Sequence, residues 1–365
     1  MNEFLSNKYA FLGQPINKRK VSAGDIRHTL LKPQMQFIIF GVLMCVVGYL
    51  STELRVLPYS WQSALATTFA FSIASVGFCL LMGYSGLASL GTGGFIGIGT
   101  YSVYFVMSES GLPLTLAIIV ALLIAVAIGT IVGFISLRIE GIYLVILTLG
   151  LSEILRNIFV ALETKINLTG SAAVIFGMKL PRASVIYVVM AALVVVMLIT
   201  HNLINSPTGR AMLAMKNSTA AAQAMGISLI KYRLLAFVIC TAYAALAGVM
   251  LMLVVRSADA SEGTGFYALI TSLNILAAVI IGGYKSIWGA VFGTFVMYGM
   301  QTTILNNIKF LSENPVIITL ISGVLVILVV MFYPGGLAQL CAELRGKLKK
   351  LFTKLKEVRY GKDLG

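Results

Sequence analysis

The sequence predicts an all-α, polytopic helical membrane protein with about ten transmembrane helices and both termini in the cytoplasm. Hydrophobic residues make up 59% of the 365 residues, charged residues make up only 11%, and the mean hydropathy is +0.95. A transmembrane helix needs roughly 20 apolar residues. Runs without a charged residue reach that length repeatedly, and the first is long enough for two helices: 56–108, 110–137, 183–209, 234–255, 263–284, 286–308 and 314–342.

Positive charge gathers at the two ends of the chain. Residues 1–35 contain six Lys and Arg against two acids, and residues 336–365 contain eight against three. Positive flanks stay on the cytoplasmic side, so both ends are expected there, which requires an even number of crossings. The net charge of +14 follows from this placement and does not indicate a nucleic-acid partner.

Ten transmembrane helices are expected within a membrane domain at 36–335, between a basic N-terminal segment and a basic C-terminal tail. Arg138 and Lys285 fall on inner turns, and Asp259 and Glu262 fall on an outer loop, which is consistent with this count. The expected helices are 36–52, 61–82, 86–107, 114–137, 142–160, 184–201, 234–255, 267–283, 286–307 and 315–333.

The one long polar interruption between apolar segments is 206–226, and it is expected to form a short cytoplasmic helix. Ser206 can cap its N-terminus, Pro207 suits the first helical position, and Gly226 suits the stop. Arg210 favours the cytoplasmic side. Many alanines make this helix slim, so it either lies in a groove of another protein or rests on the lipid headgroups.

The expected third transmembrane helix is rich in glycine. Ser89, Gly93 and Gly97 are four residues apart and share one face, while Gly91, Gly94 and Gly99 make the neighbouring faces slim. Such small-residue faces let helices pack closely in lipid. They can also border a pathway or allow a helix to break within the membrane. The glycines do not match a phosphate-binding loop, so the chain is expected to lack an ATPase site of its own.

Glu153 and Arg156 are the ionisable pair well inside an expected transmembrane helix. Glu153 would lie roughly 16 Å deep in a core of about 30 Å. A charge at that depth needs protein or water around it, and a spacing of three residues lets the two side chains meet. The pair either lines or gates a translocation pathway, or it is an internal structural pair, or the membrane span ends early so that Arg156 already lies at the outer interface.

No catalytic, metal or cofactor site is predicted. His28 and His201 are isolated at membrane edges, and the four cysteines lack paired spacing, so all are interpreted as packing or interfacial residues. The first apolar run starts near Phe37, so no cleavable signal peptide is expected. Residues 337–358 place leucines on one stripe and most Lys and Arg off it, which predicts a basic amphipathic helix on the inner leaflet.

A weak internal sequence repeat occurs at an offset of 200 residues. The pair Gly83 and Tyr84 recurs as Gly283 and Tyr284, and Gly93 recurs as Gly293. Transporters often contain repeats, but identities of this kind also arise by chance in glycine-rich helices. Both interpretations remain open.

Several segments together resemble the LivM-type permeases of branched-chain amino acid ABC importers, a binding-protein-dependent transport family. The most specific is SPTGRAMLAMKNSTAAAQAMGI, followed by KYRLLAFV. The glycine-rich segment is shared with related sugar and urea permeases. In chain order the matching segments are 83–101, 137–156, 206–227, 231–238 and 277–293.

The resemblance implies a permease subunit in the cell membrane that pairs with a second, homologous permease. Two ABC ATPase subunits would bind on the cytoplasmic face, and an extracytoplasmic solute-binding protein would deliver the solute. The 206–226 segment would be the coupling helix. The residues expected at a translocation pathway follow from the residue pattern itself and not from the resemblance: Glu153, Arg156, Gly93, Gly94 and Gly97. The expected coupling residues are Ser206, Gly209, Arg210, Ala221, Ala222 and Gly226.

Two departures from the family pattern bear on this interpretation. Residues 216–219 read Lys-Asn-Ser-Thr where the family usually has an acid, and residues 169–173 read Thr-Gly-Ser-Ala-Ala where it tends to have Thr-Gly-Gly and a polar-Gly pair. A permease of the same superfamily for urea, sugars or nucleosides is therefore an alternative. An ion-coupled secondary transporter is a second alternative, and it would depend on Glu153. An intramembrane enzyme would need a convergent catalytic set that the sequence does not contain.

Overall fold

The computed structural model describes residues 33–53, 59–136, 142–163, 165–168, 174–175, 178–179, 184–260 and 267–300, with scattered positions between 317 and 339. The described part is almost entirely helical. Its helices are α3 (Pro33–Glu53), α4 (Tyr59–Leu80), α5 (Thr92–Val103), α6 (Leu114–Ser136), α7 (Ile142–Leu162), α8 (Val185–Asn205), α9 (Pro207–Asn217), α10 (Thr219–Ala224), α11 (Leu229–Val255), α12 (Leu269–Gly282) and α13 (Ile287–Thr294). Three π-helical turns continue α4, α5 and α13: η2 (Leu81–Ser85), η3 (Tyr104–Glu109) and η5 (Phe295–Gly299).

Five helices of the described part are long and apolar enough to cross a membrane, namely α4 with η2, α6, α7, α8 and α11. They confirm the helices expected at 61–82, 114–137, 142–160, 184–201 and 234–255 to within a few residues. Shorter apolar helical segments, namely Gln34–Val46 of α3, α12, and α13 with η5, lie where three further helices were expected. The segment 1–32 and the tail beyond 339 lie outside the described residues, and so does most of the expected helix 315–333.

The prediction of one continuous helix over 86–107 is wrong. Gly86 has φ +76°, which ends η2, and the chain remains irregular until α5 begins at Thr92. Glycine adopts this left-handed conformation without the steric cost of a Cβ atom. α5 then passes into the π-helical turn η3. The expected third transmembrane helix is therefore an irregular segment, 86–91, followed by a helix whose N-terminus lies among buried residues.

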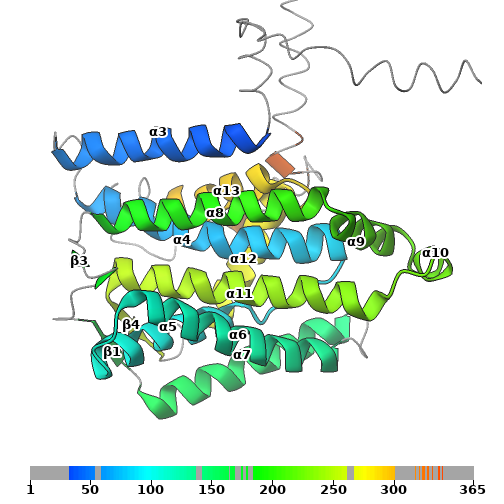
Figure 1. The fold of residues 1–365 in the computed structure, drawn as a ribbon, viewed down its shortest axis with the longest axis horizontal. Helices are drawn as coiled ribbons and strands as arrows, with labels where there is room; N and C mark the ends of the chain where they lie inside the picture. Colours follow the sequence, from blue (N-terminus) through cyan, green and yellow to red (C-terminus); the bar gives the residue numbers. More distant parts are fainter. Residues whose placement is uncertain are drawn as a thin grey trace, which may run out of the picture.

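Helix α11 lies at the centre of the bundle and packs most extensively against α4, α5 and α6 (Figure 1). Its crossing with α5 is a backbone contact. A Cβ atom at Gly99 would overlap the carbonyl oxygen of Ala245, and a Cβ atom at Gly248 would overlap that of Ile96. In lipid, helix association relies on such close van der Waals packing. Gly99 is thus a packing residue toward α11.

The two ends of the bundle differ. At one end, the strand β1 (Lys165–Asn167) pairs antiparallel with β4 (Ser257–Asp259), and the strands β2 (Val174–Ile175) and β3 (Met178–Lys179) pair with each other. At the opposite end, α9 and α10 project beyond the long helices (Figure 1). This second end is called the α9 end below.

The two glycine–tyrosine pairs of the weak internal repeat, Gly83–Tyr84 and Gly283–Tyr284, contact each other at the α9 end. A Cβ atom at Gly83 would overlap the carbonyl oxygen of Tyr284, and the hydroxyl of Tyr84 donates to the carbonyl of Lys285 at 3.2 Å. Each pair follows an apolar helix and precedes a shorter one. The turn after α4 and the turn after α12 therefore form one packed unit.

Gly99→Ala is expected to destabilise the protein, because the added methyl group meets a backbone carbonyl that cannot move aside. Overpacking of this kind costs about 1–3 kcal/mol. The matched control is Gly150→Ala in α7, where a Cβ atom meets nothing within 4 Å; there the change should be neutral or stabilising by up to about 1 kcal/mol. Thermal unfolding in detergent measures both, and equal midpoints would contradict the packing assignment.

Candidate functional site

The start of the predicted cytoplasmic helix is confirmed. Ser206 has an extended backbone, its hydroxyl accepts a hydrogen bond from the amide of Gly209 at 3.3 Å, and Pro207 opens α9. Gly209 is buried, and a Cβ atom there would overlap the backbone of Ile204. These features fix a sharp turn between α8 and α9.

The prediction of a single helix over 206–226 is wrong, because the segment is two helices. α9 ends at Asn217, and Ser218 has an extended backbone with φ −157° and ψ 111°. The Ser218 hydroxyl accepts from the amide of Ala221 at 3.3 Å and so caps a second helix, α10. The consecutive residues Asn217, Ser218 and Thr219 are the sequence signal that could have shown this break.

The helical segment ends at Gly226, as predicted. Gly226 has φ +76°, its amide donates to the carbonyl of Gln223 at 2.9 Å, and the amide of Ile227 donates to the carbonyl of Ala222 at 3.0 Å. This pair of bonds is the Schellman motif, which requires a left-handed residue. A Cβ atom at Gly226 meets nothing within 4 Å, so backbone conformation alone requires the glycine.

The coupling residues expected from the family resemblance differ in exposure. Arg210 and Ala221 are exposed, whereas Ala222 is fully buried and packs with the cluster around Met212 and Met215. Met225, 69% exposed, extends the surface at the end of α10. Ala222 therefore holds α10 to the bundle, while Ala221 is available to another protein.

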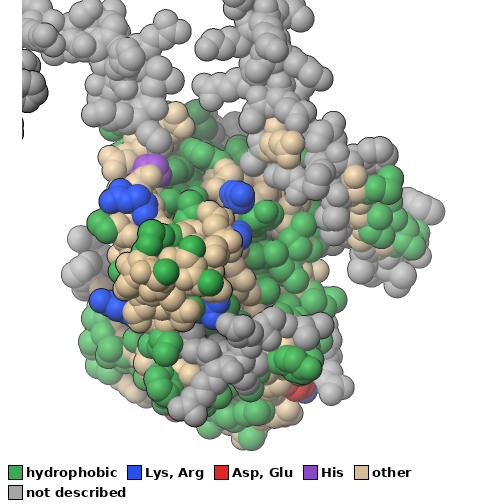
Figure 2. Space-filling model, turned by 90° about the vertical axis from the view of Figure 1, so that its right-hand side faces the viewer, with side chains coloured by type: hydrophobic (Ala, Val, Ile, Leu, Met, Phe, Trp, Pro, Cys, Tyr) green, Lys and Arg blue, Asp and Glu red, His purple; other side chains and the backbone are tan. Residues whose placement is uncertain are grey.

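The α9 end carries positive charge. Residues 206–233 contain Arg210, Lys216, Lys231 and Arg233 without an acid, and the turn at 283–286 adds Lys285. Lys and Arg side chains surround the projecting α9–α10 unit in the view onto this end (Figure 2). At the opposite end the charges are mixed: Glu109 and Asp259 end η3 and β4, Glu163 follows α7, and the basic residues Lys165, Lys179 and Arg256 lie there too.

Side-chain hydroxyls from two other helices satisfy the amides at the broken start of α5. The amide of Leu90 donates to Thr148 at 3.0 Å, that of Gly94 donates to Ser152 at 3.0 Å, and that of Gly93 donates to Ser272 at 2.8 Å. The first amides of a helix have no partner within it, and in a membrane water does not supply one. Helices α7 and α12 therefore hold the break in place.

The glycines expected to line a pathway are buried contacts within this chain. A Cβ atom at Gly93 would lie 3.0 Å from the Ser272 hydroxyl, and one at Gly94 would lie 2.9 Å from Leu155. One at Gly97 would overlap the ring of Phe159. The three glycines let α5 approach α7 and α12 closely. Their role beside a translocation pathway stays a prediction.

Glu153 and Arg156 meet as their spacing predicted. Nε and Nη2 of Arg156 donate to one carboxylate oxygen of Glu153 at 2.8 and 2.5 Å, and Nη1 donates to the carbonyl of Ala260 at 3.2 Å. The Arg156 side chain is only 8% exposed, but that of Glu153 is 47% exposed. Helix α7 continues to Leu162, six residues beyond Arg156.

One face of α7 is open and mixed in chemistry. Glu153 and Asn157 are exposed on it beside Ile146, and Gly150 has open space around it. A carboxylate facing hydrocarbon is costly, so this face needs protein or water as its neighbour. Exposed faces of α6, by contrast, carry large apolar side chains such as Leu123 and suit lipid.

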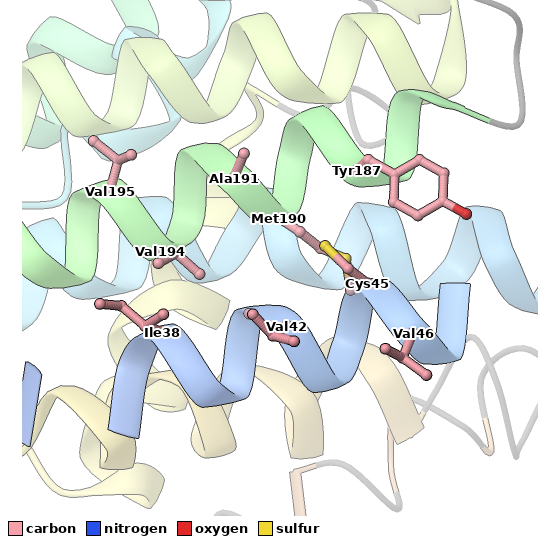
Figure 3. Close-up of a pocket in the computed structure, with 10 residues that line it drawn as sticks. Ile38, Val42, Cys45, Val46, Tyr187, Met190, Ala191, Val194 and Val195 are labelled. Atoms are coloured by element: carbon pink, nitrogen blue, oxygen red, sulfur yellow. The ribbon is translucent and has the colours of Figure 1, made fainter. Parts of the chain in front are cut away.

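A groove of about 650 Å³ lies between α3 and α8 and contains none of the predicted site residues (Figure 3). Ile38 and Val42 line it from α3, and Tyr187 and Val195 line it from α8. Its lining is apolar apart from the Tyr187 hydroxyl, which suits hydrocarbon better than a polar solute. Among the described residues, no group of three His, Cys, Asp or Glu side chains is placed to hold a metal ion.

The helical architecture, the apolar spans and the positive projecting end define a multi-pass membrane protein. Residues 60–330 match the family described as the permease component of the branched-chain amino acid transport system, and this is more than half of the chain. The chain therefore belongs to this family of ABC transporter permeases.

The curated relatives agree with the family. The chain is 28% identical over 302 residues to the high-affinity branched-chain amino acid transport system permease protein LivM of Escherichia coli (strain K12), covering 74% of this chain and 68% of the relative. The LivM protein of Salmonella typhimurium gives the same values. The probable ABC transporter permease protein YphD of Escherichia coli is 28% identical over 125 residues, which is 34% of this chain and 36% of YphD. No solved structure matches the chain.

Ser272→Ala and Ser152→Ala are each expected to lower the free energy of unfolding by about 1–3 kcal/mol, because each leaves a buried amide of α5 without a partner. The matched control is Ser102→Ala. The Ser102 hydroxyl donates to the carbonyl of Ile98 within its own helix, so no amide loses its partner. Thermal unfolding in detergent compares the three variants. A loss as large in Ser102→Ala would show that the hydroxyls do not act as caps.

Proposed function

We propose that this chain is a membrane-spanning permease subunit of an ABC importer in the cell membrane, moving branched-chain or related amino acids inward. ATP would be hydrolysed by two partner ATPase subunits. A second, homologous permease would complete the membrane part, and an extracytoplasmic solute-binding protein would supply the solute. The chain itself would act as a conformational gate without a catalytic site.

The observation that carries this proposal is the α9–α10 unit. It projects from the positively charged end of the bundle, where its family counterpart would meet the ATPase, and it exposes small or flexible side chains such as Ala221 and Met225. Positive residues favour the cytoplasmic side. Its two ends are fixed by the Ser206 cap and the Gly226 stop, and Ala222 holds α10 to the bundle, so a movement of the unit would reach the long helices.

The open face of α7 supports a pathway at Glu153 and Arg156. Arg156 is anchored to the carbonyl of Ala260, and this anchor holds Glu153 at the surface of α7. A pathway between this face and the sister permease would give the carboxylate the polar neighbour that it needs. Gly93, Gly94 and Gly97 would keep α5 close behind this face.

Support for the solute comes from the names of the relatives. The two LivM proteins are named for branched-chain amino acids, and YphD is named only as a permease. Urea, sugars or nucleosides are the alternative solutes, since the binding protein largely selects the solute. An ion-coupled carrier is a weaker alternative, because Glu153 already pairs with Arg156.

The test is solute uptake by the complete complex in proteoliposomes, with radiolabelled leucine and unlabelled competitors of each class. Uptake is expected to require ATP and the binding protein and to persist when a protonophore collapses the proton gradient. Competition by valine or isoleucine, but not by urea or ribose, would support the solute class. Uptake by the chain alone without nucleotide would contradict the proposal.

Gly226→Pro is expected to abolish uptake while the protein still inserts into the membrane. Proline cannot adopt φ +76°, and it lacks the amide that donates to Gln223. The control is Gly226→Asn, because asparagine tolerates the left-handed conformation and open space surrounds this site. Asn should retain most of the uptake. Equal uptake by both variants would show that the stop of α10 is not needed.

Cysteine labelling tests the open face of α7. In a cysteine-free background of the assembled complex, Gly150→Cys is expected to react with a membrane-impermeant thiol reagent, since open space surrounds it beside Glu153. The control is Leu123→Cys on α6, which is 65% exposed but belongs to an apolar face. Labelling of the α6 site alone would place lipid, and not water, against α7.

A further inference from the structure

Lys216, in the last turn of α9, points back into the bundle. Its ammonium donates to the carbonyl oxygens of Met82 at 3.1 Å and Gly83 at 2.8 Å, and it lies 4.5 Å from the centre of the Tyr284 ring. The stem of Lys216 packs against Gly86, where a Cβ atom would lie 3.2 Å from Cγ. The side chain is half-buried. One side chain of α9 therefore contacts two turns that are distant in the sequence.

The first turn ends the α4–η2 helix and leads into the break before α5. Carbonyl oxygens of a last helical turn have no partner within the helix and carry partial negative charge, so an ammonium group stabilises them. Through Met82 and Gly83, Lys216 holds the end of α4 to α9 at the point where the chain turns toward α5.

The second turn joins α12 to α13 and packs on the first. The Cys79 thiol donates to the carbonyl of Tyr284 at 3.2 Å, and the Tyr84 hydroxyl donates to the carbonyl of Lys285 at 3.2 Å. The Tyr284 ring receives the Lys216 ammonium on its face, an attractive contact between a cation and an aromatic ring. Lys216 therefore joins α9 to a unit made of both turns.

Two other positive side chains at this end, Arg210 and Lys231, contact neighbours in the sequence. Arg210 donates to the carbonyl of Asn205 at 3.4 Å, and the ammonium of Lys231 lies 5.9 Å from the ring of Tyr232. Burial, and then the nearby charge of Lys285, lowers the pKa of the Lys216 ammonium below its usual range. Lys216 gives up part of its hydration at this position, whereas Lys231 is exposed.

We propose that Lys216 is the positioning residue that transmits movement of α9 and α10 to the bundle, through the turn after α4 and the turn after α12. The inference rests on the proposed function, because it specifies how closure of the ATPases would reach the membrane helices. A displacement of α9 moves both turns together and is passed on to the two helices that follow them, α5 and α13.

The test uses the complete reconstituted complex and measures solute transported per ATP hydrolysed. Lys216→Met keeps most of the stem but removes the ammonium, and Lys231→Met is the matched control. In Lys216→Met, the ATPases are expected to stay bound and to hydrolyse ATP, while the transport ratio falls at least tenfold. Lys231→Met should stay within twofold of the wild type. An unchanged ratio in Lys216→Met, or loss of the ATPases from that complex, would overturn the inference.

Tyr284→Leu provides a second test that leaves α9 intact. It removes the ring beneath the ammonium but keeps the backbone carbonyl that Cys79 contacts, so the transport ratio should fall in the same direction by threefold or more. An unchanged ratio would count against the inference even if Lys216→Met failed to fold. If the wild-type complex itself showed no ATP-dependent uptake, the proposed function would fail. That result is distinguishable from an uncoupled Lys216→Met variant, in which only the variant loses transport while it still hydrolyses ATP.

Discussion

The constraint on which the structure depends is that a helix starting inside an apolar bundle must find partners for its first amides. Helix α5 starts in this way, and hydroxyls of Thr148, Ser152 and Ser272 supply the partners. Because these hydroxyls belong to α7 and α12, the helix start at Thr92 fixes the positions of two other helices. The contact of α5 with α11 through Gly99 and Gly248 then completes the central packing.

This arrangement places the irregular segment 86–91 between two tightly packed regions. On one side lie α5 and the Glu153–Arg156 pair, and on the other lie the turns that touch α9. Small displacements are passed on in such a structure, because packed helices move as units. A ligand can drive the change only if it binds one arrangement better than the other, and in the proposed importer ATP bound by the partner subunits would do so.

The sequence predicted the features that depend on local chemistry. Long charge-free runs located the helices, Ser206 and Gly226 marked the ends of the α9–α10 unit, and the three-residue spacing of Glu153 and Arg156 predicted their contact. It left a break in the glycine-rich helix open but did not place it before Thr92, because hydrophobicity is continuous there while the backbone partners come from distant helices. The hydrogen bond from Lys216 to the carbonyl of Met82 could not be predicted either, because the two residues are far apart in the sequence and a positive residue in a short loop has many possible neighbours.

Photo-crosslinking from position 221 tests the central claim most directly. Ala221 lies on the exposed side of α10. With a photoreactive amino acid at this position in membranes containing the whole complex, the account predicts an adduct with an ATPase subunit whose yield changes when nucleotide binds. An adduct with the extracytoplasmic binding protein, or no ATPase adduct in a complex that transports, would contradict it.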